Sequence, residues 1–68
     1  MKPVSGRELA KVLERNGWVL ARIHGSHHIY TKPGSMVRIS VPIHGNRPLK
    51  TGLLAFLLKQ AGMSDRDI

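Results

Sequence analysis

The chain has 68 residues and a formal net charge of +7, from 11 Lys and Arg against four Asp and Glu. A chain this short forms one domain and buries only about 60% of its unfolded surface, which excludes a large enclosed cofactor. It has no cysteine, and therefore no disulfide and no thiolate nucleophile. Its longest apolar run, residues 53–58, is far shorter than the ~20 residues of a membrane span, and no signal peptide is recognisable. We expect a single cytoplasmic domain over residues 1–68 whose charge favours a polyanionic partner.

A helix is predicted over residues 6–16. Ser5 and Glu8 have the spacing of a capping box, in which each side chain accepts a hydrogen bond from the other residue's amide. Leu9, Val12 and Leu13 then form an apolar stripe at helical spacing. Gly17 supplies the stop.

Three strands follow, over residues 18–23, 27–31 and 36–41, because each run is rich in strand-forming residues. Gly25-Ser26 is the two-residue connection of a tight hairpin, and Pro33-Gly34 forms a second turn. In the third run Val37, Ile39 and Val41 alternate with polar residues and are predicted to face the core. We interpret Trp18 as a core residue.

A second helix is predicted over residues 51–61, after a loop over residues 42–48 that contains two prolines. Its apolar side is expected to consist of Leu53, Leu54, Leu57, Leu58 and Ala61, and a further turn capped by Ser64 is expected beyond it. The order predicts an α+β fold, α-β-β-β-α, with two helices packed on one face of a three-stranded antiparallel sheet. This is the architecture of double-stranded-RNA-binding domains, and it leaves the other sheet face open.

Four segments of the chain also resemble a known family. Over nearly its whole length the chain resembles the HicA family of toxin mRNA interferases. The segments that carry the resemblance are Asn16-Gly17-Trp18, Arg22 through Tyr30, Val41-Pro42-Ile43-His44, and Leu58-Lys59-Gln60-Ala61-Gly62. The combination is more specific than the Gly-Ser-His core alone. The resemblance implies an endoribonuclease acting on mRNA, on a fold like that of double-stranded-RNA-binding domains, and neutralised by a HicB antitoxin. We expect that antitoxin to be acidic, because it must cover a basic surface.

In the family, the histidine directly after Gly-Ser is the catalytic residue, which corresponds here to His27. Some members have it one position later, which makes His28 a rival. If Ile29 points to the core, strand alternation sends His28 and Tyr30 to the open face. Alternation is least reliable directly after a turn, however, and we favour His27.

Imidazole suits RNA cleavage, because RNA carries its own 2′-OH nucleophile and needs only proton transfers and positive charge near the phosphate. Backbone amides of Gly25 and Ser26 are candidates to contact phosphate, and Lys32 or Arg38 to balance developing charge. Lys50 is a further candidate for RNA binding. Tyr30 is a candidate to stack on a base from the open face.

A zinc site is the competing use of the histidines, but adjacent strand residues point to opposite faces, so at most one of His27 and His28 joins His24 and His44. No cysteine or well-placed carboxylate completes the set, and we predict neither a metal nor another cofactor. His24 and His44 are interpreted as surface or loop histidines. The alternative function is a small RNA-binding module without catalysis.

Overall fold

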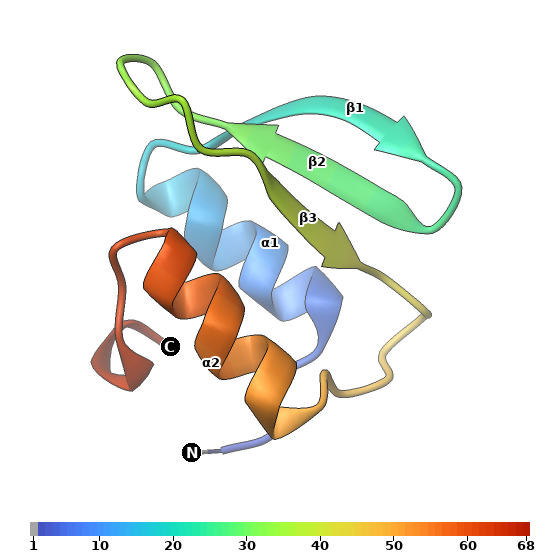
Figure 1. Ribbon diagram of the computed structural model, residues 1–68. Coiled ribbons are helices and arrows are strands. Elements are labelled where there is room, and N and C mark those ends of the chain that lie inside the picture. The colour runs from blue at the N-terminus through green and yellow to red at the C-terminus, as the bar shows by residue number, and fades with distance from the viewer. Residues whose placement is uncertain (1) are drawn as a thin grey trace.

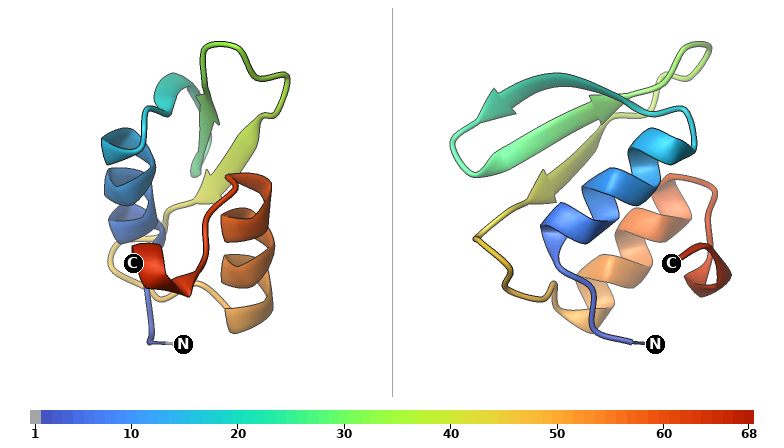
Figure 2. Two further views of the ribbon diagram at one scale, coloured as in Figure 1. Left: turned by 90° about the vertical axis from the view of Figure 1, so that its left-hand side faces the viewer. Right: turned by 180° about the vertical axis from the view of Figure 1, so that it is seen from behind.

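The computed structural model describes residues 2–68 and has the predicted α-β-β-β-α order (Figure 1). Its elements are α1 (Gly6–Arg15), β1 (Val19–His24), β2 (His27–Thr31), β3 (Ile39–Pro42), α2 (Thr51–Gln60) and a short 3-10 turn (Asp65–Asp67). The strands form one antiparallel sheet in the order β1-β2-β3. Both helices lie on the same side of this sheet, and the hairpin of β1 and β2 extends past their ends (Figures 1 and 2). No helix within residues 2–68 is long and apolar enough to cross a bilayer.

The predicted capping box opens α1. The Ser5 hydroxyl accepts from the Glu8 amide at 3.1 Å, and the Glu8 carboxylate accepts from the Ser5 amide at 3.0 Å. This amide hydrogen bond is the main reason that the pKa of Glu8 is lowered. Ser64 caps the predicted final turn in the same way.

Both helices end at a glycine with positive φ. After α1, Gly17 has φ 91°, and the Trp18 amide donates to the Leu13 carbonyl at 3.0 Å. Gly62 ends α2 by the same arrangement, with φ 70°. This pattern of bonds satisfies carbonyls that the helix itself leaves unpaired. The helix ends are therefore set by local sequence, as predicted.

The third strand is shorter than predicted, because it begins at Ile39 rather than at residue 36. In the preceding turn, backbone amides that would otherwise pair with β2 donate hydrogen bonds within the turn itself. Ser35 N–H donates to the Lys32 carbonyl at 3.0 Å, and the Ser35 hydroxyl accepts from the Val37 amide at 3.1 Å. Val37 is 37% exposed, so the prediction that it faces the core is wrong.

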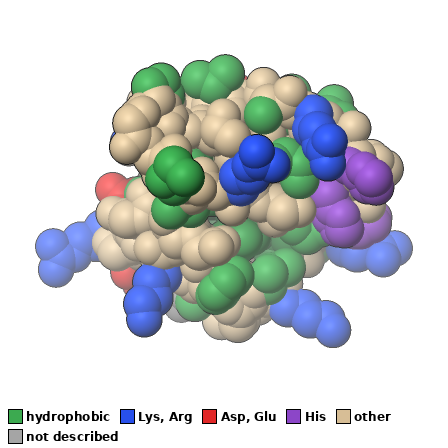
Figure 3. Space-filling model, turned by 45° about the horizontal axis from the view of Figure 1, so that its top comes forward, with side chains coloured by type: hydrophobic (Ala, Val, Ile, Leu, Met, Phe, Trp, Pro, Cys, Tyr) green, Lys and Arg blue, Asp and Glu red, His purple; other side chains and the backbone are tan. Residues whose placement is uncertain are grey.

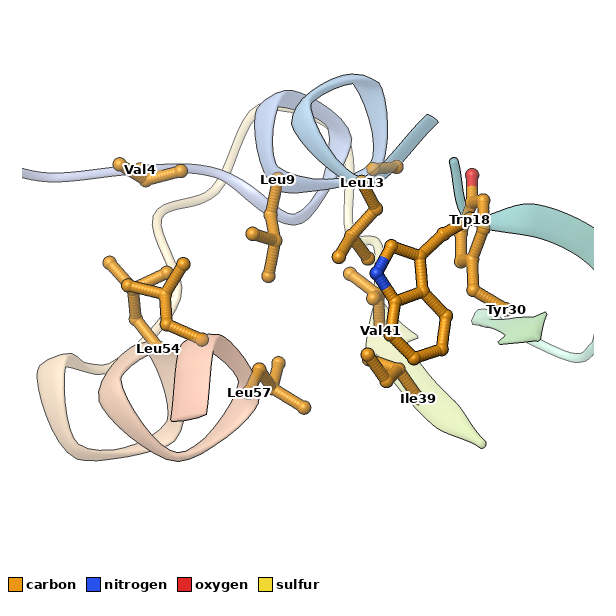
Figure 4. Packing of buried hydrophobic residues seen from close by; sticks show 11 residues of the cluster. Val4, Leu9, Leu13, Trp18, Tyr30, Ile39, Val41, Leu54 and Leu57 are labelled. Carbon is orange, nitrogen blue, oxygen red and sulfur yellow. The ribbon is translucent and has the colours of Figure 1, made fainter. Parts of the chain in front are cut away.

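One apolar core fills the space between the sheet and the helices (Figure 4). Trp18 is buried in it, as predicted. In α2 the run from residue 53 to 58 is apolar on all sides, so sequence alone did not define the buried stripe. Leu53 is 36% exposed, and its prediction as a core residue is wrong. The buried residues are Val4, Leu9, Ala10, Leu13, Trp18, Tyr30, Ile39, Val41, Leu54, Leu57 and Leu58.

A Gly6→Ala substitution tests the packing of α1 on the end of β3. Gly6 is buried, and a Cβ at this position would overlap the Pro42 carbonyl oxygen, a backbone atom that cannot rotate away. We expect the free energy of unfolding to fall by about 1–3 kcal/mol in urea denaturation, as for overpacked cores.

Gly52→Ala is the matched control. Gly52 is also in a first helical turn, but nothing lies within 4 Å of a Cβ there. We expect that variant to be as stable as the original chain or up to ~1 kcal/mol more stable, because alanine favours helix. Equal stability of the Gly6→Ala and Gly52→Ala variants would contradict the close approach.

Candidate active site

The turn between β1 and β2 is the local structure that positions the histidines. Gly25 has φ 61°, whereas no non-glycine residue among residues 2–68 has positive φ, so Ser26 keeps an ordinary conformation. A glycine with positive φ in the first position of a two-residue loop is the signature of a type II′ hairpin turn. The Ser26 carbonyl accepts from the Ile43 amide at 2.8 Å. The chain beyond β3 therefore fixes the turn from the side.

Tyr30 establishes which face of β2 meets the helices. Its side chain is 1% exposed, and its hydroxyl donates to the Glu14 carboxylate of α1 at 3.0 Å. Strand alternation puts His28 on this helix-covered face and His27 and Ile29 on the open face. This is the reverse of the orientation in which Ile29 faces the core.

The prediction that Tyr30 stacks on a base from the open face is therefore wrong. The physical reason is that the tyrosine ring buries more apolar surface than the partly buried Ile29, while Glu14 satisfies its hydroxyl. Burial, assisted by this hydrogen bond, raises the pKa of Tyr30 to about 12.

The open face at the hairpin end carries His27, His24 and Arg22. His24 is the direct cross-strand partner of His27, and Arg22 is paired with Ile29, the next open-face residue of β2. All three polar side chains are exposed. Directly opposite residues have Cβ atoms ~4.5–5.5 Å apart, so the two imidazoles are neighbours. Histidine side chains gather at this end of the molecule, with a Lys or Arg side chain beside them (Figure 3).

Arg22 was not predicted as a site residue, although the position of the hairpin turn in the sequence indicates which residues it pairs with. Once residues 25 and 26 form a two-residue turn, simple antiparallel counting pairs residue 24 with 27 and residue 22 with 29. The pairing becomes irregular only between Leu20 and Arg22, on the far side of this pair.

His28 lies in a different environment. It is partly buried and lines a groove of about 400 Å³ between α1 and the hairpin. Two cations of α1, Arg7 and Lys11, lie in the same groove and were not predicted, since only the tertiary packing brings them there. The full lining is Arg7, Ala10, Lys11, Glu14, Leu20, His28, Tyr30 and Ile43.

The basic residues predicted to assist His27 lie elsewhere. Lys32 follows the other end of β2, five residues or ~17 Å along the strand, and its ammonium lies 5.7 Å from the centre of the Trp18 ring. Arg38 directly precedes β3 at the same end of the sheet, and Lys50 directly precedes α2. The expectation that Lys32 or Arg38 balances charge beside His27 is therefore wrong, and Arg22 occupies that place.

The described part of the chain, residues 2–68, contains no group of three His, Cys, Asp or Glu side chains arranged to hold a metal ion. His44 lies in the loop after β3 and is exposed.

The fold and the site define a class of protein: a small basic α+β domain that presents histidines on a tight hairpin at the open side of its sheet. The family model described as HicA toxin of bacterial toxin-antitoxin matches residues 6–63. The chain therefore belongs to the HicA toxin family, and the resemblance drawn from its motifs is confirmed. No curated protein matches the chain.

A Tyr30→Phe substitution tests the orientation of β2. The lost hydrogen bond to Glu14 should lower the free energy of unfolding by about 1 kcal/mol at neutral pH. The folded chain also holds the tyrosine proton up to about pH 12, whereas the ordinary value is 10.0. The contribution of that proton is complete below the ordinary pKa and is lost as the pH rises toward the folded one.

We therefore expect the stability difference between the original chain and Tyr30→Phe to shrink above about pH 10, in urea unfolding measured across the alkaline range. A difference that stays constant through this range, or that is absent at neutral pH, would contradict a buried tyrosine bonded to Glu14.

Proposed function

We propose that this chain is the toxin of a toxin–antitoxin pair and acts as a metal-independent endoribonuclease on mRNA, with His27 as its catalytic residue. The observation that carries the proposal is the exposure of His27 on the open sheet face, directly after the Gly25-Ser26 turn. This is the position of the catalytic histidine in the family motif. Its rival His28 lies on the opposite face, partly covered by α1.

An open sheet face suits a long substrate. RNA can lie across it without entering a cavity, which a domain of this size does not afford. RNA supplies its own nucleophile, so the protein needs only a group that transfers protons near neutral pH and donors for the phosphate oxygens. His27 supplies the first, and the guanidinium of Arg22 with the amides of Gly25 and Ser26 supplies the second.

Three further basic residues lie away from His27: Lys32 and Arg38 at the far end of the sheet, and Lys50 before α2. In this proposal they contact phosphates away from the cleaved bond rather than at it. Such contacts carry affinity without sequence preference.

A His27→Ala substitution tests the assignment. We expect cleavage of an unstructured RNA, measured with chelator present, to fall by about 10²- to 10⁴-fold, the range that one acid–base group contributes. The fold should persist, because His27 is exposed; circular dichroism checks this.

His28→Ala, one residue along on the other face, is the matched comparison and should cleave at nearly the original rate. Loss of cleavage in His28→Ala with full activity in His27→Ala would move the active site into the groove beside α1. An RNA that is bound but not cleaved by the original chain would favour the non-catalytic RNA-binding module.

The open basic face that carries His27 also indicates what kind of protein would bind this chain. A ribonuclease with an open basic face damages its host unless that face is covered, and the family implies a HicB antitoxin as the cover. With a net charge of +7, the chain should bind most tightly to an acidic protein. We expect that protein to occlude His27 sterically.

Co-expression with an acidic HicB-type protein encoded beside this chain tests the partner. We expect the two to co-purify and the complex to lose RNA cleavage, and we expect association to slow at high salt, as for charge-steered binding. A complex that cleaves RNA as fast as the free chain would exclude occlusion of His27.

A further inference from the structure

His24 is a second histidine on the same face that the proposed function leaves unused. It flanks the Gly25-Ser26 turn on one side as His27 does on the other, and the two are direct partners across the β1–β2 ladder. Both side chains are exposed. The Ile43 amide anchors Ser26 and limits movement of the turn, which keeps the backbone of His24 and His27 paired and both side chains on one face.

Cleavage of RNA at a phosphodiester requires two proton transfers. One group removes the proton of the 2′-OH, and another protonates the departing 5′-oxygen. A lone histidine performs only one of these roles in a single step and leaves the other to water. Two neighbouring histidines, one neutral and one protonated, can perform both near neutral pH.

We propose that His24 and His27 form an acid–base pair, an inference that rests on the proposed ribonuclease function. One imidazole takes the 2′-OH proton while the 2′-oxygen forms a bond to phosphorus. The bond between phosphorus and the 5′-oxygen breaks, and the other imidazolium gives its proton to that oxygen. The products are a 2′,3′-cyclic phosphate and a free 5′-hydroxyl, and no further reactant is required.

The other histidines do not share this geometry. His28 is paired with Ile23 on the helix-covered face, and His44 lies in a loop outside the ladder. Arg22 does share it, two residues before His24 on the same face, where its guanidinium can stabilise the charge that develops on the phosphate oxygens.

The test uses two substrates of identical sequence, one ordinary RNA and one with sulfur in place of the 5′-oxygen at the cleaved bond. Because a thiolate departs without protonation, loss of the general acid has little effect on the sulfur substrate. On ordinary RNA, we expect His24→Ala and His27→Ala each to slow cleavage by about 10²-fold or more. On the sulfur substrate, one of the two variants, and only one, should recover to within about tenfold of the original chain.

Three further variants complete the design. His24→Gln, which keeps a polar side chain, should behave as His24→Ala does, whereas a purely structural role would tolerate it. His44→Ala is the control outside the ladder and should cleave both substrates at the original rate. The double variant His24→Ala/His27→Ala should cleave the sulfur substrate no faster than the single variant that stays slow on it.

The pair is overturned if His24→Ala cleaves ordinary RNA at the original rate, or if both single variants recover, or neither does, on the sulfur substrate. Each of these three results still leaves a working ribonuclease. An original chain that cleaves neither substrate instead removes the proposed function itself, so the two failures are distinguishable.

Discussion

The two-residue turn at Gly25-Ser26 is the constraint on which the arrangement of this molecule depends. Because side chains alternate along a strand, a slip of one residue in the pairing of β1 and β2 would put His24 on the same face as His28 instead of His27. Only a glycine readily adopts the φ of 61° found at the first turn position, and the Ile43 amide holds the carbonyl of the second. Turn chemistry and a tertiary hydrogen bond thus fix the same register.

The register also determines which side chains lie on each face of the sheet. The helix-covered face receives the large apolar groups of the strands, Tyr30, Ile39 and Val41, which with the helices form nearly the whole core. A chain of 68 residues cannot cover both faces of its sheet. The uncovered face is therefore free for polar side chains, and the ladder places His24 and His27 side by side there.

The sequence predicted those features that local chemistry decides. The capping box of Ser5, the glycine stops and the hairpin turn all lie where they were expected, because each depends on residues within a few positions. The orientation of β2 was not predictable, since Ile29 and Tyr30 are adjacent and both apolar, so alternation favours neither. Burial of the tyrosine ring, with its hydroxyl bonded to the carboxylate of Glu14 sixteen residues away, decides between them. Local sequence also could not predict that Arg7 and Lys11 line the groove beside His28, because only tertiary packing brings them there.

The acidic and the basic side chains have different places in this structure. Three of the four acidic side chains accept hydrogen bonds that hold the fold: Glu8 and Asp67 from backbone amides at caps, and Glu14 from Tyr30. These carboxylates lie on or near the helices, while Arg22 occupies the open face beside the histidines. The net charge of +7 reflects 11 Lys and Arg side chains against only four Asp and Glu. In the proposed function, a polyanion approaching the hairpin end would meet Arg22 and the two imidazoles on one surface, and an acidic protein that competes for that surface would have to satisfy the same groups.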